Sequence, residues 1–228
     1  MSYLCFVCIL SNYAERPVEL GVGWAPTHAD DTHAVLEWAN VGAGDLFYEL
    51  GCGDGRVAIE AAKRKAQVVC VEGDPNMLDL AKRASIIEGV ADRIEMRLGD
   101  VTTTNVSDAT VVYFFLLPII NVKLLPALER MPEGSRVIAR DSQIYGWPCG
   151  RRLKRQGGSG HGAYMMWTLP VPREAQAGMP PDEEAVIEHN LDCILEDTTY
   201  DADFEQNIGR PVDTGQKADG ERSLRIEL

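Results

Sequence analysis

Short apolar runs alternate with longer stretches of helical periodicity along the first two thirds of the chain. The apolar runs, each of strand length, are 46–50, 67–72, 94–98, 110–117 and 135–140. The stretches with helical spacing between them are 55–65, about 74–88 and 119–130. The run at 110–117 is apolar throughout, which is typical of a strand in the buried middle of a parallel sheet. This alternation predicts an α/β fold in which helical, right-handed crossovers join parallel strands.

The two ends of this pattern differ from its middle. Upstream, DDTHAVLEWANV predicts a helix that is capped by Asp30 or Asp31. After Trp147, RRLKRQ and AYMMWTLP predict two strands joined by a glycine-rich turn, and therefore an antiparallel end to the sheet. From residue 171 the chain is rich in Pro, Gly and acid, with a predicted helix at about 182–196 packed on the core. The expected parts are an N-terminal extension at 1–23, one domain at 24–170 and an acidic extension at 171–228.

The segment ELGCGDGR, residues 49–56, joins the first strand to the first helix. A glycine turn at this point brings a ligand against bare backbone. Dinucleotide-binding turns carry a third glycine where this chain has Arg56, and no Lys-Ser or Lys-Thr pair follows as in a P-loop. Glu49 precedes the turn, and its charge repels phosphate but attracts a cation. S-adenosylmethionine, which has an ammonium and a sulfonium but no phosphate, fits this pattern.

Acids also end the next two strands. Glu72 lies about 20 residues beyond the glycine turn, where α/β nucleotide folds place the acid that binds ribose hydroxyls. Asp100 follows the third strand and suits an exocyclic amino group such as that of adenine. The same position suits an acid that caps a turn. Three consecutive strands therefore each end in an acid.

Together, ELGCGDGR, CVEGDP and LGDV resemble the cofactor motifs of class I S-adenosylmethionine-dependent methyltransferases, and the resemblance covers about residues 24–169. It implies a Rossmann-like sheet of seven strands, mostly parallel with an antiparallel C-terminal strand. It implies S-adenosyl-L-methionine as the cofactor. The cofactor-binding residues that it implies are Thr27, Glu49, Gly51, Cys52, Gly53, Asp54, Gly55, Glu72, Gly73, Asp100, Val101 and Phe114.

The chain also resembles a narrower group, the small protein-lysine methyltransferases of archaea and bacteria that are related to the ATP synthase c-subunit lysine methyltransferases. The segments that carry this resemblance are Pro26-Thr27, ATVVYFFLLPIIN (109–121), PEGSRVIARDSQIYGW (132–147) and AYMMWTLP (163–170). The resemblance implies methyl transfer to a lysine amine of a protein substrate.

Methylation of an amine needs a free lone pair, whereas a lysine with a pKa near 10.4 is mostly protonated at neutral pH. Apolar walls beside a sulfonium favour the neutral amine. The candidate walls are Tyr113, Phe114, Phe115 and Leu116, and strand alternation assigns about half of them to the core. Asp141, just after the fifth strand, is a candidate to bind or deprotonate the amine, and it equally suits a turn. The candidate catalytic residues are thus Asp141, Tyr113 and Phe114.

Other functions stay open. The run FFLLP at 114–118 has no Asn or Asp, which counts against a DNA adenine or glutamine methyltransferase. A small-molecule O- or N-methyltransferase and a noncatalytic, regulatory S-adenosylmethionine-binding protein remain as alternatives. A nicotinamide-dependent dehydrogenase is the distant alternative, disfavoured by Arg56 and by the acid Glu49.

Charge is unevenly distributed along the chain. Residues 171–228 carry 15 acids against 5 basic residues, so most of the formal net charge of −13 lies in this tail. An acidic tail argues against nonspecific nucleic-acid binding. It suits attraction of a basic protein substrate, or merely a solvated tail. We expect a protein partner with an exposed lysine and no nucleic acid.

The six cysteines are scattered, and the pair Cys5 and Cys8 has no second pair or nearby His to complete a metal set. We therefore expect reduced cysteines in a cytoplasmic protein without a bound metal. The apolar run YLCFVCIL near the start is too short to cross a membrane and lacks a basic leader. We expect no membrane insertion.

Overall fold

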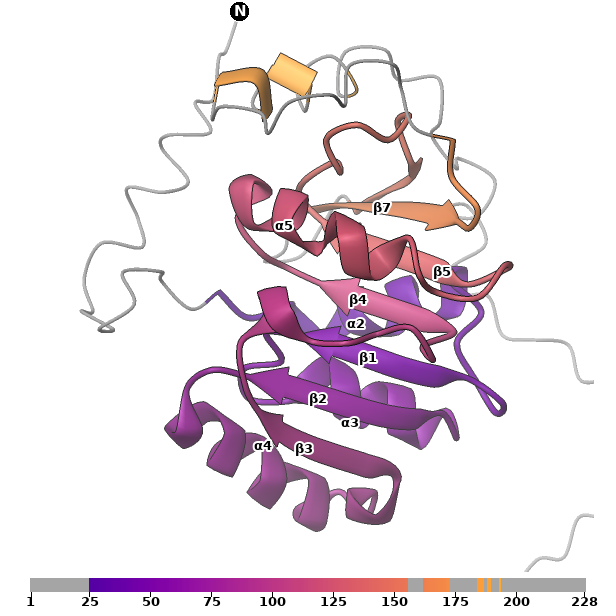
Figure 1. Cartoon of the computed structure of the whole chain (residues 1–228). Coiled ribbons are helices and arrows are strands. Elements are labelled where there is room, and N and C mark those ends of the chain that lie inside the picture. Colours follow the sequence, from indigo (N-terminus) through magenta and orange to yellow (C-terminus); the bar gives the residue numbers. More distant parts are fainter. Residues whose placement is uncertain (1–24, 156–161, 173–183, 187, 190–192, 194–228) are drawn as a thin grey trace, which may run out of the picture.

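The computed structural model describes residues 25–155, 162–172, 184–186, 188–189 and 193. Within these residues seven strands form one sheet in the order β3-β2-β1-β4-β5-β7-β6 (Figure 1). Their bounds are β1 Leu46–Leu50, β2 Gln67–Glu72, β3 Ile94–Leu98, β4 Val111–Phe114, β5 Arg136–Arg140, β6 Arg151–Arg155 and β7 Gly162–Thr168. Strands β1 to β5 run parallel, and β7 runs antiparallel between β5 and β6. The α/β sheet predicted from the sequence is confirmed.

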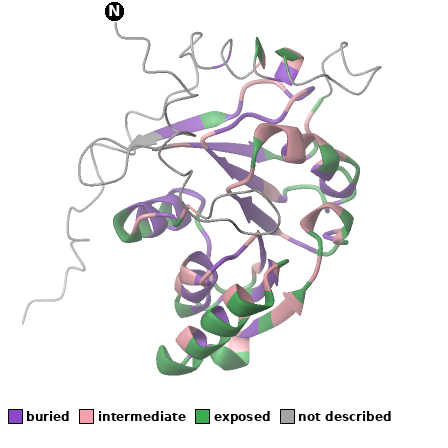
Figure 2. Ribbon diagram, turned by 90° about the vertical axis from the view of Figure 1, so that its left-hand side faces the viewer, coloured by how far each residue is buried: buried purple, intermediate pink, exposed green. Residues whose placement is uncertain are grey.

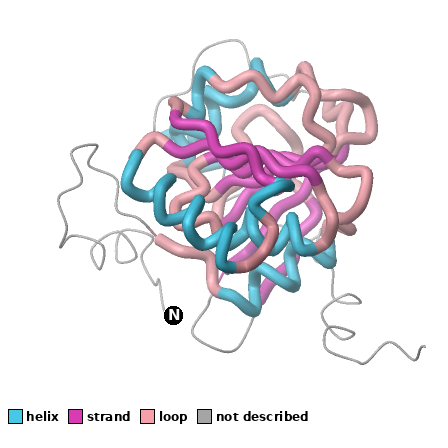
Figure 3. The backbone as a smooth tube through the Cα atoms, turned by 90° about the horizontal axis from the view of Figure 1, so that it is seen from below, coloured by secondary structure: helices cyan, strands magenta, loops and turns pink. Residues whose placement is uncertain are grey.

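Helices lie on both faces of the sheet, which forms the middle layer in Figure 3. Helices α2 (Ala29–Trp38), α3 (Arg56–Lys63) and α4 (Pro75–Ile87) contribute to one buried hydrophobic cluster. Helix α5 (Pro118–Leu128) contributes to a second cluster. Figure 2 shows buried strands between helices whose outer faces are exposed. This arrangement leaves the ends of the strands as the edge where a ligand meets the sheet.

The start of α2 differs from the prediction. The helix begins at Ala29 with His28 as its N-cap residue, and no side chain caps it. Asp30 and Asp31 lie inside the first turn, so the cap predicted at either position is wrong. Asp31 is only 2% exposed and accepts a hydrogen bond from the Tyr164 hydroxyl at 3.3 Å. This partner on β7 draws Asp31 into the core.

Strand β4 is shorter than the predicted run 110–117. It pairs with its neighbours over Val111–Phe114 only. Phe114 lies opposite Leu50, the last residue of β1, so the chain beyond it has no neighbour on that side with which to continue the ladder. Pro118 then opens α5, and proline at the first helical position favours an extended residue before it. Residues 115–117 therefore form a connection above the edge of the sheet.

The C-terminal third is described only in part. The helix predicted at 182–196 is helical at 184–186, 188–189 and 193, where Val186 and Cys193 are buried. The rest of that helix, the turn at 156–161 and the extension at 1–23 lie outside the described residues, so the domain bounds stay predictions. Among the described residues no helix is long and apolar enough to cross a bilayer.

Gly55 fixes how closely α3 approaches α4. Its φ is +78°, and a Cβ at this position would lie 2.8 Å from the Cβ of Ala81 on α4. Any larger residue meets both a strained backbone and a clash with a helix that is itself buried at Ala81. The close approach of helix and turn that a dinucleotide fold assigns to its third glycine is made here by Gly55, one residue before Arg56.

We expect Gly55→Ala to lower the free energy of unfolding by about 3 kcal/mol. About 1 kcal/mol comes from the left-handed backbone and about 2 kcal/mol from the clash. Gly44→Ala is the matched control, since Gly44 has φ +97° and a Cβ there would meet nothing within 4 Å. It should cost about 1 kcal/mol. Urea denaturation measures both, and equal losses would contradict the close packing of Gly55 on α4.

Candidate active site

The candidate site lies at the carboxyl edge of the sheet, between β1 and β4. The strand order runs outward from β1 to β3 on one side and from β4 to β5 on the other, so the winding reverses between β1 and β4. Open α/β sheets bind ligands in the crevice at such a point. Leu50 lies opposite Val71 of β2 and Phe114 of β4. The segments that follow these three strands therefore meet at one place.

The glycine turn after β1 rests on the end of β2. The amides of Gly51 and Cys52 both donate to the carbonyl of Val71, at 2.9 and 3.1 Å, and the amide of Gly55 donates to the carbonyl of Cys52 at 2.8 Å. Gly51, Gly53 and Gly55 have φ angles of 79°, 54° and 78°. These values lie in the left-handed region that favours glycine. The three glycines thus leave backbone without side chains at these points of the turn, as a close ligand contact requires.

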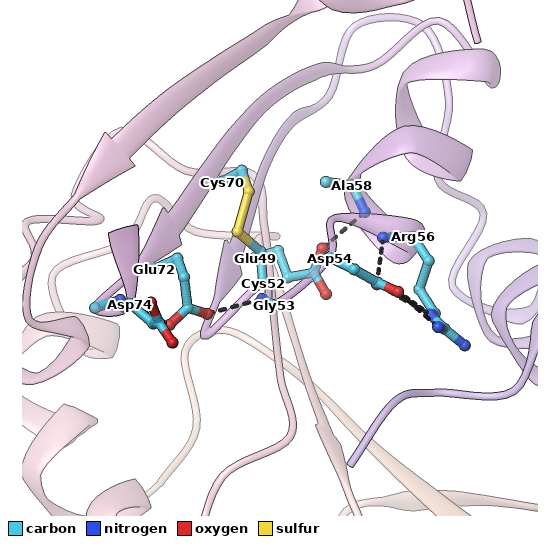
Figure 4. Close-up of a disulfide and its surroundings, with 10 residues drawn as sticks. Glu49, Cys52, Gly53, Asp54, Arg56, Ala58, Cys70, Glu72 and Asp74 are labelled. Carbon is cyan, nitrogen blue, oxygen red and sulfur yellow. Dashed lines mark hydrogen bonds and ion pairs between the residues drawn. A yellow bond between two sulfur atoms is a disulfide. The ribbon is translucent and has the colours of Figure 1, made fainter. Parts of the chain in front are cut away.

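Glu49 is a buried acid directly beneath this turn. It is 4% exposed, and its Oε2 accepts a hydrogen bond from the amide of Ala58 in α3 at 2.7 Å (Figure 4). Burial raises the pKa of Glu49 well above its ordinary value of 4.5, although the Ala58 amide lowers it. A cation placed beside this carboxyl would favour its ionised form. The predicted pairing of Glu49 with a positively charged ligand group fits its position.

Glu72 holds the glycine turn to the end of β2. Its Oε2 accepts from the amide of Gly53 at 2.8 Å (Figure 4). Its Oε1 accepts from the amides of Gly73 and Asp74 at 2.8 and 3.0 Å. A carboxylate offers about four acceptor positions, and these three bonds already use most of them. A ribose with two hydroxyls therefore needs one of these amide bonds to break or to be shared. The residue types at this point fit a ribose-bearing ligand.

Asp100 caps the short turn Val101–Thr103 after β3. Its Oδ1 accepts from both the amide and the hydroxyl of Thr102, at 2.8 Å each. These bonds lower the pKa of Asp100, so its exposed carboxylate is ionised at neutral pH. The amide of Gly99 donates to the carbonyl of Glu72 at 2.9 Å, which keeps this turn beside the ribose acid. The capping role is confirmed, and the contacts of Asp100 and Val101 with adenine stay predictions.

Asp54 and Arg56 pair at the start of α3. The Nη2 of Arg56 lies 2.6 Å from Oδ2 of Asp54, and its Nε also donates to that carboxylate (Figure 4). The remaining Nη1 donates to the carbonyl of Thr27 at 3.0 Å. Arg56 thus connects the cofactor turn to a segment 29 residues upstream.

Pro26 and Thr27 form a strap across the carboxyl edge of the sheet. Arg56 binds the strap from α3, and Arg140 at the end of β5 donates from its Nη1 to the carbonyl of Pro26 at 3.3 Å. The hydroxyls of Thr27 and Tyr113 are 2.9 Å apart. Burial raises the pKa of Tyr113 above its ordinary value of 10.0, so this hydroxyl keeps its proton. Thr27 is 5% exposed, and its predicted contact with the cofactor stays a prediction.

Above β4 the candidate walls separate into two kinds. Tyr113 and Phe114 are 1% and 0% exposed and belong to the hydrophobic clusters on opposite faces of the sheet. Phe115 and Leu116 are half-buried in the connection that follows. The guanidinium of Arg140 lies over the Phe115 ring, 4.4 Å from its centre. The burial of Phe114 favours a core role over the predicted contact, and Phe115 and Leu116 are better placed as walls.

Asp141 is held in one conformation just after β5. Its φ is +58°, its amide donates to the carbonyl of Ala163 at 2.7 Å, and its Oδ1 accepts from the amide of Ala163 at 2.8 Å. Its Oδ2 accepts from the Nε of Arg140 at 3.2 Å. Burial raises the pKa of Asp141 above its ordinary value of 3.8, against the lowering by Arg140 and the Ala163 amide. A left-handed backbone at an aspartate costs energy, and such strained conformations cluster at functional sites.

The prediction of reduced cysteines is wrong for four of the six. Cys52 is bonded to Cys70, and Cys149 to Cys193. Composition did not reveal these pairs, because Cys52 and Cys70 meet only when the turn after β1 folds over β2. The reduced state was one ground for the cytoplasmic placement, which stays a prediction. Cys5 and Cys8 lie outside the described residues.

Sequence reasoning also missed Arg140. It is 8% exposed and contacts the strap, Asp141 and Phe115 at once. The available signal was a basic residue at the last position of a strand with an apolar middle, followed directly by an acid. A charge at that point needs a partner when it is buried.

The family model that matches this chain and two of its relatives are methyltransferases. The family model for the ANTKMT methyltransferase domain matches residues 49–151. A protein-lysine N-methyltransferase of Saccharolobus islandicus (strain REY15A) is 34% identical over 148 residues, which are 63% of this chain and 92% of the relative. A ribosomal protein L11 methyltransferase of Desulfitobacterium hafniense is 34% identical over 94 residues, which are 41% of this chain and 30% of the relative.

Solved structures agree on the fold. The crystal structure of an RNA methyltransferase from Salinibacter ruber, in complex with S-adenosyl-L-homocysteine, has a TM-score of 0.60 at 36% identity and covers 64% of this chain and 94% of that one. A SAM-dependent O-methyltransferase from Thermotoga maritima has a TM-score of 0.54 at 14% identity, over 66% and 69% of the two chains. The second likeness shows the shared fold alone.

We expect binding of S-adenosylhomocysteine, which carries the same ammonium, to release a proton from Glu49. The raised pKa leaves Glu49 partly protonated above pH 4.5, and a bound cation lowers that pKa, so affinity rises with pH in this window. Calorimetry at a series of pH values above 4.5, each in two buffers of different ionisation enthalpy, measures the released protons. Glu49→Gln should abolish the release and weaken binding about tenfold.

The matched control is Asp100→Asn, because the pKa of Asp100 is lowered and its carboxylate is already ionised in this pH range. This variant should keep the proton release of the parent. An unchanged release in Glu49→Gln would show that Glu49 does not meet the ammonium.

Proposed function

The chain belongs to the class I S-adenosylmethionine-dependent methyltransferases and uses S-adenosylmethionine as its cofactor, and on this premise we propose that it methylates the ε-amine of a lysine in a protein. The curated relative that this chain covers over 92% of its length is a protein-lysine N-methyltransferase. The acceptor side of the site supports the same choice.

The observation that carries the proposal is the pairing of apolar walls with a positioned acid. Phe115 and Leu116 are half-buried after β4, and Asp141 is fixed by Ala163 after β5. A nucleobase acceptor is read through hydrogen bonds to its edge, whereas the segment FFLLP at 114–118 has no polar side chain. A lysine needs instead a dry channel for its chain and a carboxylate for its amine.

Residues of this chain favour the loss of a proton from the lysine. A lysine with a pKa near 10.4 must lose a proton before its nitrogen has a lone pair to donate. The apolar walls penalise its charged form, and the guanidinium of Arg140 beside Phe115 adds a like charge. Asp141 binds the incoming ammonium and accepts its proton, which leaves to solvent because the side chain of Asp141 is 31% exposed. The cofactor supplies the methyl group on a sulfonium.

The name of the Salinibacter ruber relative raises RNA as the competing acceptor. Charge argues against it, since the formal net charge of this chain is −13 and RNA binding relies on basic surfaces. The acidic tail at 171–228 suits instead a basic protein that presents the lysine. We place this reaction in the cytoplasm, where such substrates are synthesised.

We expect labelled methyl groups from S-adenosylmethionine to enter protein when the full chain is incubated with host lysate. Residue-level mass spectrometry should place them on lysines. Lysate treated with ribonuclease should give the same labelling, and lysate treated with protease should give none. Label in RNA or in small metabolites without labelled lysine would overturn the lysine acceptor.

We expect Asp141→Asn to lower kcat about 100-fold and to leave the affinity for S-adenosylhomocysteine unchanged, because the carboxylate acts on the amine and not on the cofactor. Asn tolerates the left-handed backbone at this position, so the change tests charge without added strain. Asp79→Asn, an exposed acid on α4, is the control and should keep the parent kcat. An equal loss in both variants, or a loss of cofactor affinity in Asp141→Asn, would contradict the role.

A further inference from the structure

A covalent bond lies inside the cofactor site. Cys52 stands between Gly51 and Gly53 in the glycine turn, and Cys70 stands two residues before Glu72 on β2. Their sulfurs are bonded, and their Cα atoms are 5.6 Å apart (Figure 4). The bond therefore joins the two segments that carry the glycine turn and the ribose acid.

Hydrogen bonds also hold the turn on β2. The amides of Gly51 and Cys52 bind the carbonyl of Val71, and the amide of Gly53 binds Glu72. Three glycines with positive φ give the turn more conformational freedom than any other residue type would. When the ribose hydroxyls compete for Glu72, its bond to the Gly53 amide is one that can weaken. The disulfide then adds a covalent link to the two Val71 bonds that still hold the turn over β2.

We propose that Cys52 and Cys70 are a redox modification site that sets the affinity of the chain for its cofactor. The disulfide form holds the turn in the binding conformation before the ligand arrives. The dithiol form must order the turn during binding, and this ordering costs affinity. The proposal rests on the cofactor and not on the identity of the methyl acceptor.

The chemistry balances as thiol–disulfide exchange. A thiolate of an external dithiol attacks one sulfur of the pair, which releases the other cysteine as a thiolate and forms a mixed disulfide. The second thiol of the reductant then resolves it. Two electrons pass to the pair, the cysteines gain two protons as thiols, and the reductant leaves as its own disulfide. A small external disulfide reverses both steps.

Access to the sulfurs depends on the turn. Cys52 is 3% exposed and Cys70 is 0% exposed, so a reductant reaches them only when the turn opens. A ligand that holds the turn closed slows this opening. Linkage also requires that a ligand which binds the disulfide form more tightly make the disulfide harder to reduce by the same factor. A purely structural disulfide that does not affect binding would lack this reciprocity.

The test compares oxidised and reduced full-length chain. Calorimetry with S-adenosylhomocysteine should give about fivefold weaker binding after reduction by dithiothreitol. In a redox titration of oxidised and reduced dithiothreitol, with maleimide trapping and mass spectrometry of the Cys52 and Cys70 peptides, saturating S-adenosylhomocysteine should shift the midpoint ratio about fivefold toward the disulfide.

Variants separate this pair from the second disulfide. Cys149→Ser removes the bond to Cys193, far from the glycine turn in sequence, and should keep both the affinity and its redox response. Cys70→Ala should bind S-adenosylhomocysteine about as the reduced chain does and lose the response to dithiothreitol. If Cys70→Ala does not fold, the titration of the unmodified chain still decides.

Equal affinities of the oxidised and reduced chain, or a midpoint that the ligand does not move, would overturn the proposal. Because neither measurement uses a methyl acceptor, a failed lysine assignment leaves the outcome unaffected. Loss of all binding with an unfolded circular dichroism spectrum on reduction would also overturn it, since the pair would then be a structural bond only.

Discussion

One backbone carbonyl, that of Val71, anchors the donor side of this enzyme. It receives the amides of both Gly51 and Cys52, so the glycine turn can form only where β1 and β2 are in their observed register. The turn also sets where α3 begins. It ends at Gly55, where a larger residue would clash with Ala81 of α4. The position of Glu49 follows as well, since its partner Ala58 lies in α3. A slip of one residue between β1 and β2 would displace all of these groups together.

The sequence predicted what depends on neighbours along the chain. Strand periodicity located β1, β2, β3 and β5 closely, and the acids Glu49, Glu72 and Asp100 stand at strand ends as expected. What it did not predict depends on partners far away. Asp31 was assigned to a helix cap because its partner, Tyr164, is 133 residues distant. The end of β4 was placed too late because only the pairing with β1 shows where the ladder stops.

The same distinction between local and distant partners applies to Arg140 and to the cysteine pairs. The residues next to Arg140 in the sequence do not set it apart from other basic residues. Its contact with Pro26 joins positions that are 114 residues apart. The cysteine pairs were missed because spacing along the chain does not report which strand ends meet. Residue types therefore predicted where the groups of the candidate donor side stand, since these groups are local to three strand–turn units. The groups of the proposed acceptor side come from β4, β5, β7 and the upstream strap, and only the assembled fold brings them together.

The two hydrogen bonds between Asp141 and Ala163 have a consequence for how this enzyme can diversify. The backbone of residue 141 is left-handed, so only Asp, Asn and Gly are accommodated there at low cost, and only Asp brings a charge. On the proposed function, an acceptor that needs a carboxylate would keep Asp at position 141. New acceptor preferences would then arise elsewhere. The half-buried pair Phe115 and Leu116 lies beyond the ladder between β1 and β4, so mutation there would reshape the proposed channel without unfolding the sheet. Libraries that aim at a changed substrate range should randomise this pair and leave the acid in place.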